Sequence, residues 1–189
     1  MQVLKEEVRE RILAAAVQVF YEKDFRSAKL QDIARLADVS ASLLYSYFEN
    51  KEKLFEGVVS SAPFDFNRIA REEESIIANT PSERYQIAAE GPLLNMLAHH
   101  KLLVILIDKS QGTAYEHAKD DFVESIERHI RYMVNEHASL RYPDLLAHVL
   151  ASNFVESLME VARHYSNEDE ARDMLALIAQ CYYEGVNSL

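Results

Sequence analysis

Residues 30–54 read LQDIARLADVSASLLYSYFENKEKL and predict two short helices joined by a tight turn, followed at once by the start of a third. The first helix carries apolar residues at helical spacing, which gives it a buried face. Asp38 falls in the turn, where its side chain tolerates a left-handed backbone. Ser40 is a good N-cap for the second helix. That helix turns Leu44 and Phe48 inward at i, i+4 spacing.

Two helices of this size with a turn of about three or four residues form a helix-turn-helix, whose second helix enters the DNA major groove. The outer side of the second helix carries no acidic residue; its members are Ala41, Ser42, Leu43, Tyr45 and Ser46. The same periodicity also fits an ordinary three-helix core segment. Periodicity alone therefore leaves both interpretations open.

Three stretches of the first third of the chain carry a resemblance to a known family. They read ILAAAVQVFYEKDF (residues 12–25), LQDIARLADVS (residues 30–40) and LLYSYFENKEKLFEGVV (residues 43–59). This text resembles the DNA-binding domain of the tetracycline-repressor (TetR) family. The rest of the chain is similar to that family only in its length and in being helical throughout. The resemblance favours the DNA-binding interpretation.

The resemblance also implies which residues meet DNA. It implies that Tyr45, Tyr47 and Lys51 contact phosphates, and that residues 41–43 lie nearest the bases. Members of the family usually carry two threonines before the first of the paired helices, whereas this chain has Ala28 and Lys29. Lys29 could replace the missing hydroxyl by pairing with a phosphate. The full candidate set is Lys29, Ser40, Ala41, Ser42, Leu43, Tyr45, Ser46, Tyr47 and Lys51.

Composition indicates a globular, helix-rich protein of the cytoplasm. About half of the 189 residues are hydrophobic (49%), and glycine and proline number only four each. The single cysteine, Cys181, cannot form an intramolecular disulfide, which fits a reducing compartment. No signal peptide is expected, because the N-terminus is charged. The longest apolar run, residues 102–107, is too short to cross a membrane.

The acidic charge is unevenly distributed. The chain has a net charge of -11, which repels DNA at long range. Residues 1–57 hold 9 Lys/Arg and 10 Asp/Glu, which leaves 11 against 21 for residues 58–189. The N-terminal part is thus nearly neutral, which permits DNA binding through a few well-placed contacts.

The whole chain is expected to be all-α, with about nine helices in two domains: a DNA-binding domain of residues 1–50 and an effector-binding and dimerisation domain of residues 51–189. The fourth helix begins at Lys51 and is kinked or interrupted at Pro63. A kink is expected at Gly91-Pro92, and a long helix from about Ala114 to Glu136. The acidic run of residues 72–74 is interpreted as a solvated face.

The resemblance implies two further sites in the C-terminal part. The first is an effector pocket, whose candidate lining consists of aromatic, methionine and histidine side chains: Tyr85, Met96, His99, His100, Leu103, Tyr115, Phe122 and Tyr132. Residues of this kind also build helix cores. The second is a homodimer interface formed by the last two helices, with the candidates Leu150, Phe154, Leu158, Leu175, Ile178 and Tyr182.

No catalytic residue, cofactor or metal ligand is predicted. Neighbouring His99 and His100 point about 100° apart on a helix and do not make a ligand pair. Glu156, Glu160 and His164 share a helix stripe, which we interpret as a polar face with stabilising pairs. The expected function is a ligand-responsive transcriptional regulator, a repressor that binds a palindromic DNA operator as a homodimer and is released by a small-molecule effector. The alternative is an interaction protein that keeps the fold but binds a protein partner.

Overall fold

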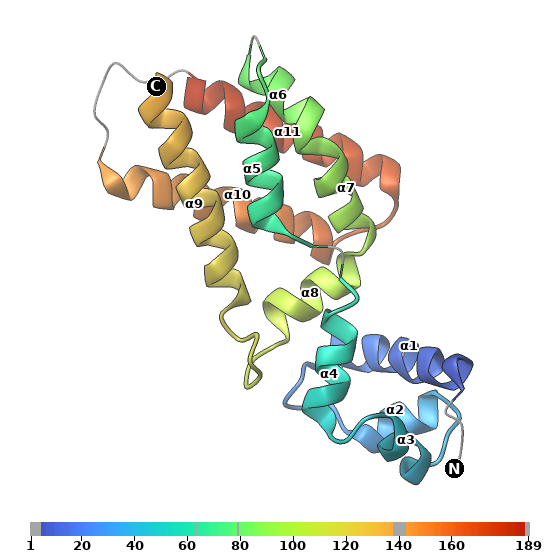
Figure 1. Ribbon diagram of the computed structural model, residues 1–189. Coiled ribbons are helices and arrows are strands. Elements are labelled where there is room, and N and C mark those ends of the chain that lie inside the picture. The colour runs from blue at the N-terminus through green and yellow to red at the C-terminus, as the bar shows by residue number, and fades with distance from the viewer. Residues whose placement is uncertain (1–4, 63, 79, 138–142, 188–189) are drawn as a thin grey trace. The chain divides into compact units, whose positions relative to one another are not determined.

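The computed structural model describes residues 5–62, 64–78, 80–137 and 143–187 (Figure 1). These residues form eleven α-helices and no strand, which confirms the all-α prediction. The helices are α1 (Glu6–Lys23), α2 (Leu30–Leu36), α3 (Ala41–Tyr47), α4 (Lys51–Val59), α5 (Phe66–Ser75), α6 (Pro81–Ala88), α7 (Glu90–Ala98), α8 (His100–Asp108), α9 (Ala118–His137), α10 (Asp144–Arg163) and α11 (Glu168–Asn187).

The described residues contain eleven helices rather than about nine because two segments are each divided into two helices. One was predicted to be kinked or interrupted at Pro63, and the other to be kinked at Gly91-Pro92. The helix that begins at Lys51 ends at Val59, and α5 starts afresh, with the Asp65 carboxylate accepting a hydrogen bond from the Arg68 N–H at 2.9 Å. The second division falls at Ala89, between α6 and α7. Gly91 and Pro92 instead lie in the first turn of α7, where a missing proline N–H costs nothing.

The start of the long helix α9 also differs from the sequence prediction. It begins at Ala118 rather than at about Ala114. The preceding residues form tight turns, in which the Ser110 hydroxyl donates to the Tyr115 carbonyl at 2.9 Å and Gly112 adopts a φ of 87°. Side-chain bonds of serine and threonine to the backbone compete with helix formation, which explains the delay.

The chain divides into two compact units. The N-terminal unit comprises Met1–Ala62 and Lys101–Ala118, and the C-terminal unit comprises Pro63–His100 and Lys119–Leu189. Most of α8 therefore belongs with α1 to α4. The functional division predicted between residues 50 and 51 stays a prediction.

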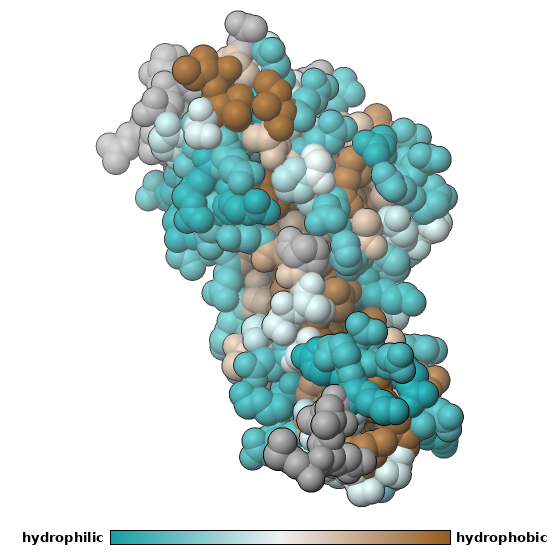
Figure 2. Space-filling view, turned by 45° about the vertical axis from the view of Figure 1, so that its right-hand side comes forward, coloured by the Kyte–Doolittle hydropathy of each residue, from teal (hydrophilic) through white to brown (hydrophobic). Residues whose placement is uncertain are grey.

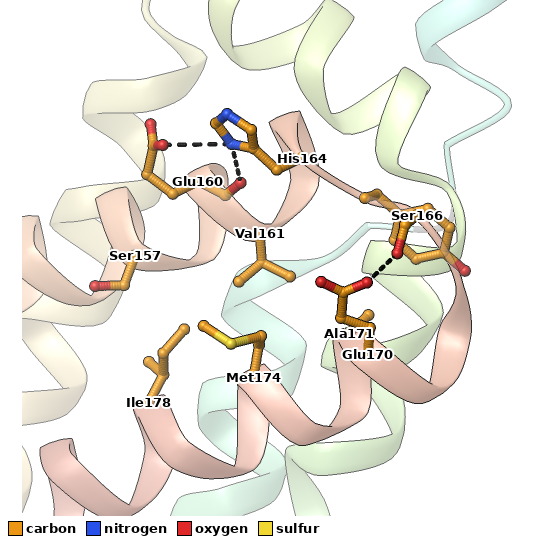
Figure 3. Close-up of a pocket in the computed structure, with 10 residues that line it drawn as sticks. Ser157, Glu160, Val161, His164, Ser166, Glu170, Ala171, Met174 and Ile178 are labelled. Atoms are coloured by element: carbon orange, nitrogen blue, oxygen red, sulfur yellow. Dashed lines mark hydrogen bonds and ion pairs between the residues drawn. The ribbon is translucent and has the colours of Figure 1, made fainter.

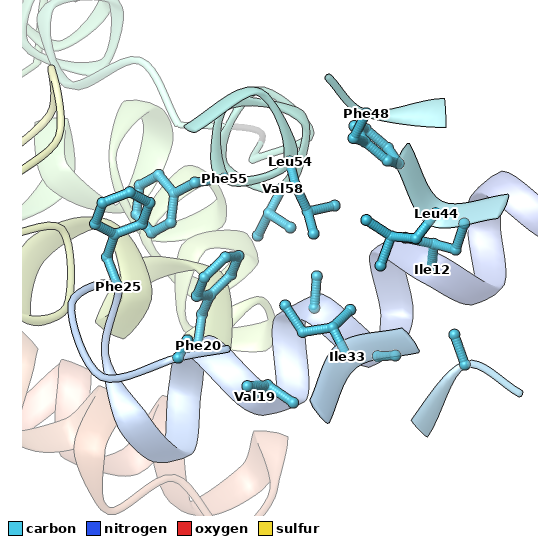
Figure 4. Packing of buried hydrophobic residues seen from close by; sticks show 14 of the residues in the cluster. Ile12, Val19, Phe20, Phe25, Ile33, Leu44, Phe48, Leu54, Phe55 and Val58 are labelled. Atoms are coloured by element: carbon cyan, nitrogen blue, oxygen red, sulfur yellow. The ribbon is translucent and has the colours of Figure 1, made fainter. Parts of the chain in front are cut away.

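The core of the N-terminal unit is built around three phenylalanines (Figure 4). The ring of Phe55 meets those of Phe20 and Phe25 edge to face, at centroid distances of 5.1 and 5.2 Å. Ile33 of α2 and Leu44 of α3 are completely buried in the same cluster. Because every helix of this unit contributes a buried side chain to one core, α2 and α3 are held in a fixed geometry.

The C-terminal unit consists of α5 to α7 and α9 to α11. Phe66 of α5 stacks on Phe122 of α9 at a centroid distance of 3.5 Å, and α10 buries Val155, Leu158 and Met159 completely. By length and composition α10 could cross a membrane, but a core helix passes the same test. The face of the molecule in Figure 2 is mostly hydrophilic, with hydrophobic residues reaching the surface in several places.

Candidate functional site

The turn between α2 and α3 has the predicted geometry. Asp38 adopts a left-handed conformation with a φ of 52°, and the Val39 N–H donates to the Ala34 carbonyl at 3.0 Å. The Ser40 hydroxyl accepts a hydrogen bond from the Leu43 N–H at 3.1 Å. This bond satisfies a backbone donor that would otherwise have no partner at the start of α3. The predicted turn and N-cap are both confirmed.

One face of α3 is left open to solvent. Leu44 is buried, whereas Ala41, Ser42, Tyr45 and Ser46 are exposed and Leu43 is half-buried. Tyr45 has 54% of its surface exposed. The hydroxyls of Ser40 and Ser42 lie 3.0 Å apart, and that of Ser46 donates to the Ser42 carbonyl at 3.1 Å. The open face thus offers small and aromatic side chains without a negative charge.

The predicted phosphate-binding residues have different surroundings. Lys29 is exposed at the N-terminus of α2 and makes no side-chain cap. The Tyr47 hydroxyl is bonded to the backbone of Lys5, at 2.8 Å to its nitrogen and 3.2 Å to its oxygen. The Lys51 ammonium donates to three backbone carbonyls of the loop between α1 and α2. For Lys51 these bonds compete with the predicted phosphate contact, which stays a prediction.

The predicted effector-pocket residues belong to both units and differ in burial. Leu103 and Tyr115 belong to the N-terminal unit, and Leu103 is completely buried there. In the C-terminal unit Tyr85, Met96 and Phe122 are buried, His99 and Tyr132 are exposed, and His100 stacks on Tyr165 at a centroid distance of 4.3 Å. Their assignment to a pocket stays a prediction.

A small cavity inside the C-terminal unit is lined by other residues. It has a volume of about 30 Å³, room for about two water molecules. Its apolar wall comes from four helices, α5, α7, α9 and α10, together with Ala89, and consists of Ile69, Ala70, Ala89, Leu93, Ile126 and Phe154. Its polar members are Glu73, His129 and Tyr182.

Two of these polar members, Glu73 and His129, form a charged cluster with Glu74, which is half-buried beside the cavity. His129 Nε2 lies 3.5 Å from Glu73 Oε2, and His129 Nδ1 lies 3.1 Å from Glu74 Oε1. Burial disfavours the charged imidazole, but the two carboxylates outweigh it and raise the pKa of His129 above its ordinary value. Burial, followed by the nearby Glu73 charge, raises the pKa of Tyr182.

The solvated-face interpretation of residues 72–74 is wrong for Glu73. Only 4% of Glu73 is exposed, because its partner His129 is contributed by α9, far along the chain. Nothing in the local sequence distinguishes Glu73 from its neighbour Glu72, which is exposed and pairs with Arg68. The sequence signal for this buried pair is His129, a histidine on the apolar side of the long helix α9.

The predicted dimer residues are divided between interior and surface. Phe154, Leu158 and Leu175 are buried within the chain, whereas Ile178 lines a surface groove of about 430 Å³ between α10 and α11. Figure 3 shows Met174, Ile178 and Val161 converging on this groove, with His164 and Glu160 at its rim. Among the side chains that the structure describes on these two helices, the exposed large apolar residues are Leu145, Val149, Met174 and Leu177.

The stripe formed by Glu156, Glu160 and His164 is occupied by ion pairs. Glu156 accepts from Lys119 at 2.6 Å and from Arg163 at 2.5 Å, and Glu160 also pairs with Arg163. The hydrogen bonds to Arg163 and Lys119 hold the pKa of Glu156 below its usual range. Among the described residues, no group of three or more His, Cys, Asp or Glu side chains is placed to hold a metal ion.

The fold and the open face of α3 define a class: an all-helical protein with an exposed helix-turn-helix. Residues 12–58 match the family model described as bacterial regulatory proteins, tetR family. The chain is 38% identical over 60 residues to the HTH-type transcriptional repressor NicS of Pseudomonas putida. That match covers 32% of this chain and 28% of NicS, so it spans less than a third of the relative's length.

Solved structures extend the likeness to the whole fold. A TetR-family transcriptional regulator from Bordetella parapertussis superposes with a TM-score of 0.73, at 20% identity, over 98% of both chains. The transcriptional regulator FadR from Bacillus subtilis, solved with stearoyl-CoA, gives a TM-score of 0.60 at 14% identity, over 94% of this chain and 98% of that one. Residues 12–58 are therefore similar to the N-terminal domain of the tetR family of bacterial regulatory proteins, and the fold of the chain is similar to that of these solved structures.

Proposed function

We propose that this protein is a cytoplasmic transcriptional repressor without enzymatic activity, which binds a palindromic DNA operator as a homodimer and is released by a small-molecule effector. The observation that carries the proposal is the open face of α3. A rigid core fixes the buried side of the helix at Leu44, while the opposite side is exposed and free of acidic residues. That is the arrangement a recognition helix needs in the major groove.

The contacts to DNA divide into those that position the protein and those that read sequence. Lys29 and Tyr45 are exposed and would bind phosphates, which fixes the register of the protein on the duplex. Ala41, Ser42 and Leu43 would face the bases. Leucine and alanine offer only apolar contact, such as to a thymine methyl, so that few direct hydrogen bonds to bases are expected.

The homodimer would form through α10 and α11. The exposed residues Leu145, Val149, Met174 and Leu177 lie on these helices, and a second copy of the chain would remove them from water. In dimeric helix-turn-helix proteins the two recognition helices are spaced by about one turn of DNA, roughly 34–36 Å. The interface therefore determines whether both helices reach successive major grooves.

The effector would bind in the C-terminal unit at the cavity beside Glu73 and His129. Two carboxyl groups face one imidazole there, so the cluster favours a ligand with a positively charged nitrogen, and the apolar wall favours an apolar body. A ligand larger than about two water molecules must enlarge the cavity. Such a ligand binds the enlarged conformation selectively, which is the condition for shifting an equilibrium between two states. Tyr85, Met96 and Phe122 are buried in the same unit and are further candidates for contact.

Release from DNA would follow if the enlarged conformation changes the spacing of the recognition helices through the movement of α4. The effector need prefer that conformation by only roughly 1–3 kcal/mol, a typical coupling free energy between sites. By the same linkage, operator DNA must weaken effector binding by the same factor.

The test is a selection of bound genomic DNA fragments by the full-length protein at two salt concentrations, with Tyr45→Ala as the DNA-binding control. We expect enrichment of a palindrome that the variant does not enrich. No enrichment by the wild-type protein at either salt would contradict the proposal.

The effector class is tested on the selected operator with an aromatic quaternary ammonium compound as the probe. We expect the probe to lower the operator affinity of the wild-type protein and of Glu72→Gln, whose altered side chain is exposed. Glu73→Gln should no longer respond. An equal response of both variants would show that Glu73 does not recognise the cation.

A further inference from the structure

The loop between α1 and α2 is fastened by the side chain of Lys51. The Lys51 ammonium donates to the carbonyl oxygens of Phe25 at 2.7 Å, Ala28 at 3.2 Å and Arg26 at 3.3 Å. It also lies 4.5 Å from the centroid of the Phe25 ring. An ammonium has three protons and no more. All three are directed to this loop, so a phosphate could be bound only by giving up a carbonyl.

A second helix holds the same loop from another side. The Phe25 N–H donates to the carbonyl of Lys109, directly after α8, at 2.9 Å. A Cβ built on Gly112 would come within 3.1 Å of Arg26 Nε, so the Arg26 side chain lies against the backbone there. The loop is therefore bonded at its start to the end of α8 and along its length to the first residue of α4.

The position of α2 depends on this loop. Ala28 is followed by Lys29, which is the N-cap of α2, and α2 packs against α3 in the helix-turn-helix. Both α4 and α8 are covalently continuous with segments of the C-terminal unit. A movement of either helix would be passed to the start of α2 through hydrogen bonds rather than through loose contact.

We propose that Lys51 is a positioning residue that fixes the start of α2 for DNA binding by clamping the loop of residues 25–28, and that it does not contact DNA phosphate. The proposal rests on the proposed DNA-binding function for its consequence on affinity, but the clamp itself is independent of DNA. It makes the loop the common attachment point of α4 and α8.

The clamp is tested first without DNA, by amide hydrogen exchange of the full-length protein. Lys51→Met keeps the aliphatic stem and removes the ammonium. The matched control is Lys53→Met, on the same helix, whose exposed ammonium pairs with Glu56. We expect faster exchange over residues 25–33 in Lys51→Met and unchanged exchange there in Lys53→Met. Unchanged exchange in Lys51→Met would overturn the clamp whether or not the protein binds DNA.

The second arm separates positioning from phosphate contact by the salt dependence of operator binding. A lost phosphate contact lowers the slope of log affinity against log salt by about 0.9. For Lys51→Met we expect about tenfold or greater weakening of operator binding at every salt concentration, with the wild-type slope.

Lys51→Arg keeps the charge, but the planar guanidinium cannot reproduce the three hydrogen bonds to carbonyls, so this variant should also bind the operator weakly. A slope lowered by about 0.9 in Lys51→Met, or wild-type affinity of Lys51→Arg, would show a phosphate contact instead. Absence of operator binding by the wild-type protein would contradict the proposed function alone, because the exchange experiment still decides the clamp.

Discussion

The hydroxyl of Tyr47, at the end of α3, is bonded to both backbone polar groups of Lys5, the N-cap of α1: it accepts from the N–H at 2.8 Å and donates to the carbonyl at 3.2 Å. The two residues are 42 positions apart, so this pair ties the N-cap of α1 to the end of α3. The side chain of Tyr45, on the same helix as Tyr47, is exposed to solvent.

The same Tyr→Phe substitution is therefore expected to lower stability at Tyr47 and to weaken operator binding at Tyr45. Tyr47→Phe removes both hydrogen bonds to Lys5 and should lower the free energy of unfolding by about 1 kcal/mol. Tyr45→Phe should leave the unfolding free energy within about 0.5 kcal/mol of wild type. It should weaken operator binding without changing the salt slope, because a neutral hydroxyl releases no counterion from the DNA. Urea unfolding and operator titration measure the two quantities. Equal stability of Tyr47→Phe and wild type would contradict the structural role of Tyr47.

The buried cluster of His129, Glu73 and Glu74 predicts a pH-dependent stability. The pKa of His129 is raised in the folded protein, so the folded state binds more protons than the unfolded state above a pH of about 6.5. The stabilisation is fully present below that pH and is lost as the pH rises through the folded pKa. The raised pKa of Tyr182, the phenol at the same cavity, adds a loss only at higher pH, above about 10.

The measurement is the free energy of unfolding by urea between pH 5.5 and 9. We expect a decline with rising pH in the wild-type protein, a smaller decline in Glu74→Gln, and a flat profile in His129→Gln. A decline of wild-type size in His129→Gln would assign the pH dependence to other groups.

Gly112 and Gly91 allow the effect of a Gly→Ala substitution to be compared at a left-handed and at a helical backbone position. Gly112 has a φ of 87° and lies against Arg26, whereas a Cβ on Gly91 would meet nothing within 4 Å. Gly112→Ala should destabilise the protein by about 1–2 kcal/mol, because L-residues avoid the left-handed region. Gly91→Ala should be neutral or stabilising by up to about 1 kcal/mol, because alanine is the better helix former. Thermal unfolding of both variants checks the difference, and a stabilised Gly112→Ala would contradict it.

If the proposed dimer forms through α10 and α11, one surface substitution should convert the protein from a dimer to a monomer. Leu177 on α11 is 57% exposed, so Leu177→Arg should not disturb the interior of a subunit but should separate the subunits. Ile77→Arg is the matched control, because Ile77 is fully exposed and lies outside α10 and α11. Sedimentation equilibrium should give a monomer for Leu177→Arg and a dimer for Ile77→Arg and wild type. A dimeric Leu177→Arg would move the interface away from this face.

Features that depend on neighbours in sequence were predictable. The left-handed Asp38, the Ser40 N-cap and the inward Leu44 follow from backbone preferences and helical spacing over a few residues, and all three agree with the structure. A local cap of the same kind stands at the start of α11, where the Asn167 side chain accepts a hydrogen bond from the Glu170 N–H at 2.9 Å. These local signals, with the resemblance they carry, determined the fold class and the helix-turn-helix.

Features that join distant parts of the chain were decided only by the tertiary structure. Glu73 is buried because His129 lies beside it, and Lys51 is bonded to carbonyls about 25 positions earlier in the chain. Likewise α8 groups with α1 to α4, where Ile105 is buried in their core and the Lys109 carbonyl accepts from the Phe25 N–H. A carboxylate or an ammonium has the same local sequence signature whether water or a distant partner satisfies it. The sequence by itself therefore determined which residues can cap, turn and pack, while the choice of partner for each charged group required the folded chain.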